Sequence, residues 1–469
     1  ERRSNLEALI DENIETGDGL FDAWAPADVV ITNPPYMGSR SMPADLKERI
    51  RDAFHPFHRD LYSAFIWRCI QLAEDVVAVL AQQTIWYLRR FEKARRKILE
   101  AGRLHDFFHL GAHAFQSLTG EKASVAAFVF APDDDRDVAT HFVDLRDNKE
   151  PADKRAKLEE ALAERDDEQR EPMEAFSILP GHVLAHWLPE SLREHFRRSP
   201  RLEDIADIPG TQNKTGRNSK YVRTWQEVEP DQLHRAPAIV DAGSAQGRWV
   251  FYSKGGRYAP WWGNWQNVVD WSDDARHFYQ TNRTSNMLAE EWWFREGICY
   301  TDFGGRTFNA RWMPPGCVFD MAGPAIFPHE SDAAPREMIG ALLAVLNSTP
   351  VRALLNALNP SLHYQVSDLR ALPLPEMSEE LRESFARRAW ELVEGYRLVA
   401  RFVDSSPRSW SMPGDEERQR ASAFLTERPR LEHELDRLVC EYYECPDLLV
   451  DQRKRPTHHY ESRADWGST

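Results

Sequence analysis

The sequence predicts an α/β fold in its first part, then a mixed α+β region, then C-terminal helices. Three observations lead to this prediction. Up to about residue 132, short apolar runs typical of buried strands alternate with helical stretches. From 173 to 375 the chain is rich in Trp, Gly and Pro and carries short β-like segments. From 376 onward, helical periodicity returns.

The first part contains several elements that the apolar pattern predicts. A strand at 28–32 ends where two prolines follow, because proline cannot continue a central strand. Strand and helix then alternate, which favours a largely parallel sheet. The further elements expected are a helix at 62–75, a strand at 76–81, a basic amphipathic helix at 89–100, and strands at 104–110 and 124–131.

The rest of the chain divides by composition. Residues 133–172 begin with an acidic run and are then almost all charged residues or Ala, which predicts a charged helical linker. Two long helices are expected at 379–403 and 415–443. The predicted parts are therefore 1–132, 133–172, 173–375 and 376–469.

Composition and charge exclude several classes of protein. The 469 residues are 42% hydrophobic, which excludes wholesale disorder. They contain no run of 18 apolar residues, so no transmembrane helix and no membrane partner are expected. Five cysteines do not make a disulfide framework, and a cytoplasmic location is expected. The net charge of −16 argues against non-specific polyanion binding by the whole surface, but a local basic groove remains compatible with it.

The stretch Asn33-Pro34-Pro35-Tyr36 directly follows the first predicted strand. Ligands of open α/β sheets bind outside the carboxyl ends of strands. A rigid Pro-Pro turn can direct the side-chain carbonyl of Asn33 and the main-chain carbonyl of Pro34 toward an exocyclic amine, which donates to both. This suits methyl transfer to the N6 amine of a flipped adenine that stacks on Tyr36. The alternative is an ordinary turn, since Asn-Pro often begins one.

The motif resembles motif IV of the gamma-class, adenine-specific DNA methyltransferases. Downstream stretches resemble one branch of that class, the PglX-like methyltransferases of BREX phage-defence systems, which are related to the methylase part of type IIG restriction enzymes. Gly111-Ala-His-Ala-Phe115 with Gly120 and the apolar run at 124–130 resembles motif VIII. The ordered resemblance covers most of residues 14–375.

The resemblance implies roles for individual residues. Asn33 and Pro34 would bind the target amine in the turn that Pro35 completes, and Tyr36 and Phe115 would stack on the two faces of the adenine. Asp18 matches motif III, whose Asp binds the amino group of S-adenosylmethionine. Phe115 can instead be a core aromatic, and Asp18 a plain turn residue. The cofactor carries its own leaving group, so no metal is expected.

Residues 173–375 resemble the target-recognition region of this branch. The matching stretches include Thr215-Gly-Arg-Asn218, Tyr221-Val-Arg223, Lys254-Gly-Gly256 and Asn359-Pro360. Basic and amide side chains in these stretches suit phosphates and base edges of double-stranded DNA, although a solvated face over a Trp-rich core is the alternative. The predicted DNA-binding residues are Lys214, Arg217, Asn218, Lys220, Arg223, Lys254 and Arg257.

The resemblance is incomplete at its start. Enzymes of this class bind the cofactor with strands that precede the Asn-Pro-Pro-Tyr motif, and only 27 residues precede the strand at 28. We therefore expect an incomplete Rossmann-like methyltransferase sheet whose first strand is an exposed edge, and an N-terminal half in the same or a separate chain as partner. Permutation is the alternative, with Ala238 to Gly247 as the cofactor turn, but no helical stretch follows it.

Other functions stay open at this stage. His105, His109 and His113 recur every four residues, but on a strand this spacing does not converge on a metal. The chain could be a non-catalytic DNA-recognition or assembly subunit of a defence system, with other defence proteins as partners. It could also be the methylase part of a type IIG restriction enzyme. The leading prediction is a site-specific DNA adenine N6-methyltransferase, represented by its C-terminal portion.

Overall fold

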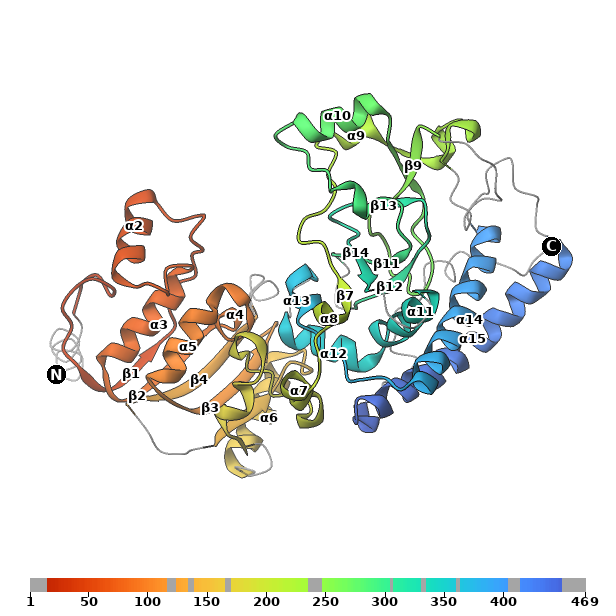
Figure 1. Ribbon diagram of the computed structural model, residues 1–469. Coiled ribbons are helices and arrows are strands. Elements are labelled where there is room, and N and C mark those ends of the chain that lie inside the picture. The colour runs from red at the N-terminus through yellow and green to blue at the C-terminus, as the bar shows by residue number, and fades with distance from the viewer. Residues whose placement is uncertain are drawn as a thin grey trace, which may run out of the picture. The chain divides into compact units, whose positions relative to one another are not determined.

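The computed structural model describes residues 15–115, 124–133, 139–164, 170–234, 247–303, 307–329, 335–359, 363–403 and 414–448. The chain divides into two compact units, residues 1–187 and 188–469 (Figure 1). Gly120 and residues 238–246 of the alternative cofactor turn lie outside the described residues. The division into four parts by residue number stays a prediction.

The first unit is built on a six-stranded sheet of order β1-β2-β4-β3-β5-β6. The strands are β1 (Ala27–Thr32), β2 (Ala73–Gln82), β3 (Gly102–Gly111), β4 (Val125–Pro132), β5 (Thr140–Asp144) and β6 (Arg170–Glu171). β1 runs parallel to β2, and β3 runs parallel to β5. β4 is antiparallel to both β2 and β3. The α/β class is confirmed, but the expectation of a largely parallel sheet is wrong, because β3 and β4 pair as antiparallel neighbours.

Helices α3 and α5 contact the strands and cover one face of this sheet (Figure 1). The helices of the first unit are α2 (Ala44–Ala53), α3 (Leu61–Leu72), α4 (Thr84–Tyr87), α5 (Glu92–Glu100) and α6 (Pro151–Glu164). α3 ends three residues earlier than predicted, because β2 begins at Ala73 with no loop between them. The core includes Trp86, which meets Phe107 and Phe128 edge to face at 5.9 and 5.0 Å.

The range 133–172 contains more than the predicted linker. It holds helix α6, as expected, but it also contributes β5 and β6 to the first sheet. The strand β5 (Thr-His-Phe-Val-Asp) holds only two apolar residues, yet its first four residues are buried. Because the flanking sequence is charged, the sequence did not predict this strand, which extends the sheet beyond β3.

The second unit carries two four-stranded sheets, of orders β13-β9-β10-β8 and β12-β11-β14-β7. Its strands are β7 (Ala206–Asp207), β8 (Val222–Thr224), β9 (Trp249–Ser253), β10 (Asn267–Asp270), β11 (Gly297–Tyr300), β12 (Ala310–Met313), β13 (Cys317–Phe319) and β14 (Ala325–Pro328). Tyr252, Val269 and Trp271 lie in a buried cluster around the first of these sheets.

Helices precede, interrupt and follow the strands of the second unit. They are α7 (Glu190–Arg198), α8 (Leu202–Ile205), α9 (Asn218–Tyr221), α10 (Asp273–Thr281), α11 (Pro335–Leu346), α12 (Thr349–Leu358), α13 (Val366–Arg370), α14 (Glu379–Val403) and α15 (Asp415–Tyr442). The two long helices predicted from the sequence are α14 and α15, which run side by side (Figure 1).

Within the described ranges no single helix is long and apolar enough to cross a membrane. The bent pair of α11 and α12 has the length and composition, but most of its residues are buried inside the second unit.

All five cysteines are free and buried. Cys69 lies in the first unit, and Cys299, Cys317, Cys440 and Cys445 lie in the second. Burial raises the pKa of the Cys69, Cys299 and Cys317 thiols.

Candidate functional site

The Asn-Pro-Pro-Tyr turn leaves the sheet at the carboxyl end of β1. β1 ends at Thr32, which pairs with Val79 of the parallel strand β2. Asn33 is exposed, Pro34 is buried, and Tyr36 is 36% exposed. The two prolines end the strand and buried Pro34 anchors the turn, while the amide of Asn33 and the ring of Tyr36 stay accessible to a ligand.

A second segment of the chain holds this turn in place. The N–H of Met37 donates to Oδ1 of Asp60 at 3.1 Å, and the N–H of Leu61 donates to the carbonyl of Met37 at 2.9 Å. Asp60 is 6% exposed, and this burial raises its pKa. Tyr62 adds an edge-to-face contact with Tyr36 at 6.0 Å. The turn is thus fixed by Asp60 and Tyr62, two residues that the sequence did not indicate.

Phe115 lies beyond the end of β3 and is 38% exposed. β3 points the same way as β2, because β4 is antiparallel to both. Phe115 and Tyr36 therefore follow strands that end at the same edge of the sheet. Three strand spacings separate β1 from β3, about 14 Å, so the loops after the strands must bridge this distance to hold one base between both rings.

Asp18 organises a turn of its own. Its Oδ1 accepts hydrogen bonds from the N–H groups of Leu20 at 3.0 Å and Phe21 at 3.3 Å. Its other oxygen lies 4.0 Å from a guanidinium nitrogen of Arg49. These contacts are those of a turn residue, and the cofactor role of Asp18 stays a prediction.

The predicted DNA-binding residues all lie in the second unit. Four of them, on and just before α9, are exposed: Lys214, Arg217, Asn218 and Lys220. Arg257 is also exposed, and Arg223 is half-buried, with its guanidinium donating to the carbonyls of Ser219 and Val222. Gly216 is required in this segment, since its φ is +70° and a Cβ would lie 2.5 Å from Oγ of Ser285.

Lys254 differs from the other predicted DNA-binding residues. Its ammonium lies 2.9 Å from Oδ2 of Asp320, a carboxylate that also accepts a hydrogen bond from the Tyr252 hydroxyl at 2.6 Å. The Lys254 side chain is only 19% exposed. Its charge is therefore already neutralised inside the fold, which weakens the case for a phosphate contact.

Aromatic side chains among the basic residues mostly belong to the core. Tyr221, Trp261 and Trp265 are 6%, 3% and 6% exposed. They cannot offer a face to a base without unpacking the unit. The alternative of basic side chains over a Trp-rich core is thus correct for these three rings.

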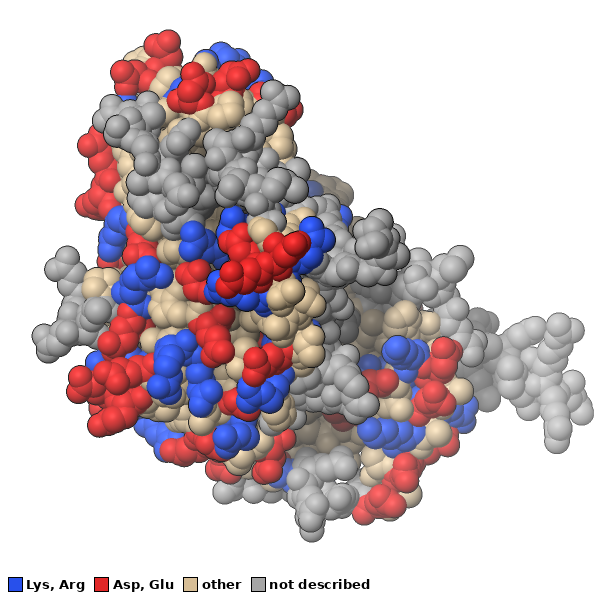
Figure 2. Space-filling model, turned by 90° about the vertical axis from the view of Figure 1, so that its right-hand side faces the viewer, with Lys and Arg blue, Asp and Glu red and all other residues tan. Residues whose placement is uncertain are grey.

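Charges elsewhere on the second unit compensate one another. Figure 2 shows the side on which α14 and α15 lie, and basic and acidic side chains alternate there. Along α15, Arg430 pairs with Glu434 at 2.5 Å, and Arg430 and Arg437 also pair with Glu427 and Glu441. Such a face does not attract a polyanion.

Comparisons with known proteins agree with this architecture. A family model described as Eco57I restriction-modification methylase matches residues 6–115, the part that carries the Asn-Pro-Pro-Tyr turn. The adenine-specific methyltransferase BrxX of Escherichia coli O9:H4 (strain HS) is 26% identical over 378 residues, which are 80% of this chain and 30% of BrxX. The adenine-specific methyltransferase PglX of Lacticaseibacillus casei (strain Zhang) is 25% identical over 472 residues, covering 94% of this chain and 38% of PglX.

One solved structure matches nearly the whole fold. The type IIL restriction-modification enzyme MmeI, solved in complex with DNA, superposes with a TM-score of 0.53 at 10% identity and covers 93% of this chain and 56% of MmeI. This similarity concerns the fold. The chain spans about a third of the length of the two curated relatives. Together the matches confirm the resemblance to the PglX-like adenine-specific methyltransferases and to the methylases of restriction-modification enzymes.

Proposed function

We propose that this chain is the C-terminal portion of a DNA adenine N6-methyltransferase that acts in phage defence or restriction-modification. The observation that carries the proposal is the exposed amide of Asn33 in a turn fixed at the carboxyl end of β1. The names of the relatives, both adenine-specific methyltransferases, support the same reaction.

In the proposed reaction, Asn33 and Pro34 accept hydrogen bonds from the N6 amine of an adenine flipped out of the duplex. These bonds localise the nitrogen lone pair, which would displace the sulfur of S-adenosylmethionine from its methyl group, so that the C–S bond breaks, S-adenosylhomocysteine leaves and the amine gives up one proton to solvent. Tyr36 stacks on the base, and Phe115 closes over its other face. S-adenosylmethionine supplies the methyl group and its own leaving group when bound, with Asp18 as the residue that would contact it.

The partner we propose is the N-terminal half of the enzyme, in the same or a separate chain. β1 is the edge of the described sheet, and its side chains Val29 and Ile31 are 55% and 79% exposed. Exposed apolar residues on an edge strand favour pairing with another strand. Strands with the cofactor motifs would pair with this edge, and the segments that connect those strands would cover Val29 and Ile31 on the face of the sheet. Since the substrate is DNA and all five cysteines are free, we place the protein in the cytoplasm.

The open edge also favours the rival function, a DNA-recognition or assembly module without catalytic activity. Calorimetric titration of S-adenosylmethionine into the folded chain tests the need for a partner half. Absence of binding supports the proposal that the cofactor site needs the N-terminal half. Micromolar binding would show that this chain completes the cofactor site by itself.

The decisive variant is Asn33→Ala, assayed for methyl transfer with the N-terminal half supplied. We expect methylation to be lost while DNA affinity changes little, because Asn33 acts on the amine and not on the duplex. Lys47→Ala, an exposed change on α2, is the control and should retain the wild-type rate. Equal rates for Asn33→Ala and wild type would disprove the role of Asn33, and absence of methylation in the reconstituted wild type would favour the rival.

A further inference from the structure

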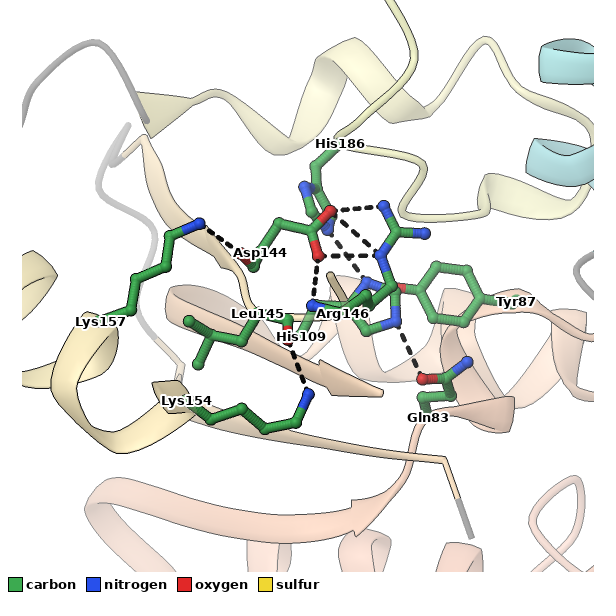
Figure 3. Close-up of polar contacts among 9 residues, drawn as sticks. All are labelled: Gln83, Tyr87, His109, Asp144, Leu145, Arg146, Lys154, Lys157 and His186. Atoms are coloured by element: carbon green, nitrogen blue, oxygen red, sulfur yellow. Dashed lines mark hydrogen bonds and ion pairs between the residues drawn. The ribbon is translucent and has the colours of Figure 1, made fainter. Parts of the chain in front are cut away.

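Two histidine side chains meet beside the carboxyl ends of β3 and β5 (Figure 3). Nδ1 of His109 lies 3.2 Å from Nε2 of His186, which is 77 residues away along the chain. An oxygen of Asp144, the last residue of β5, completes the group, and the three atoms lie within 4.8 Å of one another. Two nitrogens that bind one tetrahedral zinc ion are roughly 3.4 Å apart, so this pair already has the spacing of ligands.

Hydrogen bonds around His109 set which of its ring nitrogens carries the proton. Nε2 of His109 lies 2.9 Å from the side-chain oxygen of Gln83, and this contact requires a proton on Nε2. Nδ1 then carries the lone pair. It faces His186 and also lies 3.3 Å from the Tyr87 hydroxyl, a contact that a bound ion would replace. A ligating histidine is usually oriented in this way by an acceptor behind its other nitrogen. Tyr87 stacks on the His109 ring at 5.2 Å and fixes its plane.

Asp144 is oriented by Arg146. The Arg146 guanidinium donates to both carboxylate oxygens of Asp144, with Nε 2.9 Å from Oδ1 and 3.0 Å from Oδ2, and the main-chain N–H of Arg146 donates to Oδ1 at 3.1 Å. The guanidinium in turn lies over the ring of Trp187, 4.0 Å from its centroid. The Asp144 and Arg146 side chains are 34% and 32% exposed, so the group has a side open to solvent through which an ion and a water ligand can enter.

We propose that His109, His186 and Asp144 bind a divalent transition-metal ion of the zinc type, with water as the fourth ligand. Such an ion would connect the ends of β3 and β5 to the segment that carries His186. The site is independent of the proposed methyl transfer, and it differs from the His105, His109 and His113 set considered from the sequence. Only His109 of those three takes part.

Arg146 makes the proposal specific. Its positive charge near Asp144 opposes a cation and competes for the carboxylate, so the native site should bind its ion less tightly than the same ligands without the arginine. Lys154 does not compete in this way, because its ammonium donates to the carbonyls of Leu110 and Leu145. Removal of Arg146 should therefore strengthen binding, an effect that no structural histidine pair would show.

The experiment is calorimetric titration of Zn²⁺ into the full, chelator-treated chain. We expect one site in the wild type, weakening of at least about tenfold in His186→Gln, and tightening in Arg146→Gln. His113→Gln, a change at an exposed histidine near β3, is the matched control and should bind like the wild type. Asp144→Asn provides a second test if His186→Gln does not fold.

Two results would overturn the proposal. One is a wild type that binds no Zn²⁺ under these conditions. The other is binding that is unchanged in folded His186→Gln or Asp144→Asn, since this would place the ion elsewhere among the 16 histidines.

Discussion

Asp60 shows how one buried side chain prepares a turn for chemistry. Replacement by Ala removes the acceptor of the Met37 N–H, and we expect the loss of about 1–3 kcal/mol of unfolding free energy, measured by urea denaturation. Asp60→Asn retains an oxygen at the same place. Because burial already raises the pKa of Asp60, a neutral amide should be tolerated there. A stable Asp60→Ala would show that the turn does not depend on this contact.

Arg217 and Lys254 should respond differently to removal, although both are basic residues of the predicted DNA-binding set. Arg217→Ala should weaken duplex binding for all sequences. It should also reduce by about one the slope of the logarithm of the DNA-binding constant against the logarithm of the salt concentration. Lys254→Ala should leave this slope unchanged and cost at least about 2 kcal/mol of stability, because Asp320 loses its only described cationic partner and keeps only neutral hydrogen-bond donors. DNA titrations at several salt concentrations measure the effect of each variant on DNA binding, and urea denaturation measures its effect on stability. A reduced slope in Lys254→Ala would contradict the buried pairing.

Elements of the second unit depend on close helix contacts. In α11, a Cβ on Gly340 would lie 2.9 Å from the main chain of Ala386 and 2.7 Å from Nε1 of Trp390 in α14. Gly340→Ala should therefore destabilise the protein by about 1–3 kcal/mol, in spite of the better helix propensity of Ala. Gly210→Ala, where the nearest atom is a guanidinium nitrogen of Arg370 at 3.6 Å, is the control and should change stability by less than about 0.5 kcal/mol. Equal unfolding midpoints for Gly340→Ala and the wild type would show that α11 and α14 can move apart without cost.

Strands and helices with a clear apolar period could be predicted from the sequence, whereas the strands with which they pair could not. β1, β3 and β4 were indicated by their apolar runs, but the antiparallel place of β4 depends on pairings between distant segments. The same holds for the site. Asn33 stands in a rigid local motif, so its turn was predictable. Asp60 is 23 positions from Met37, and His186 is 77 from His109, and no local pattern connects them.

At the scale of the whole molecule, two compact units suggest two unfolding steps. Four of the 16 tryptophans lie in the first unit (Trp24, Trp67, Trp86 and Trp187), so fluorescence reports mainly on the second. We expect the midpoints from fluorescence and from circular dichroism to differ in urea. Coincident transitions from both probes would mean that the units unfold as one.

The positions of the buried cysteines allow the order in which the two units unfold to be measured. Every thiol is buried, so an alkylating reagent should find none of them in the native protein. A brief pulse of reagent at rising urea would mark Cys69 when the first unit opens and the other four positions when the second does. Peptide masses read after digestion would then tell which half of the chain opened first, without any engineered label.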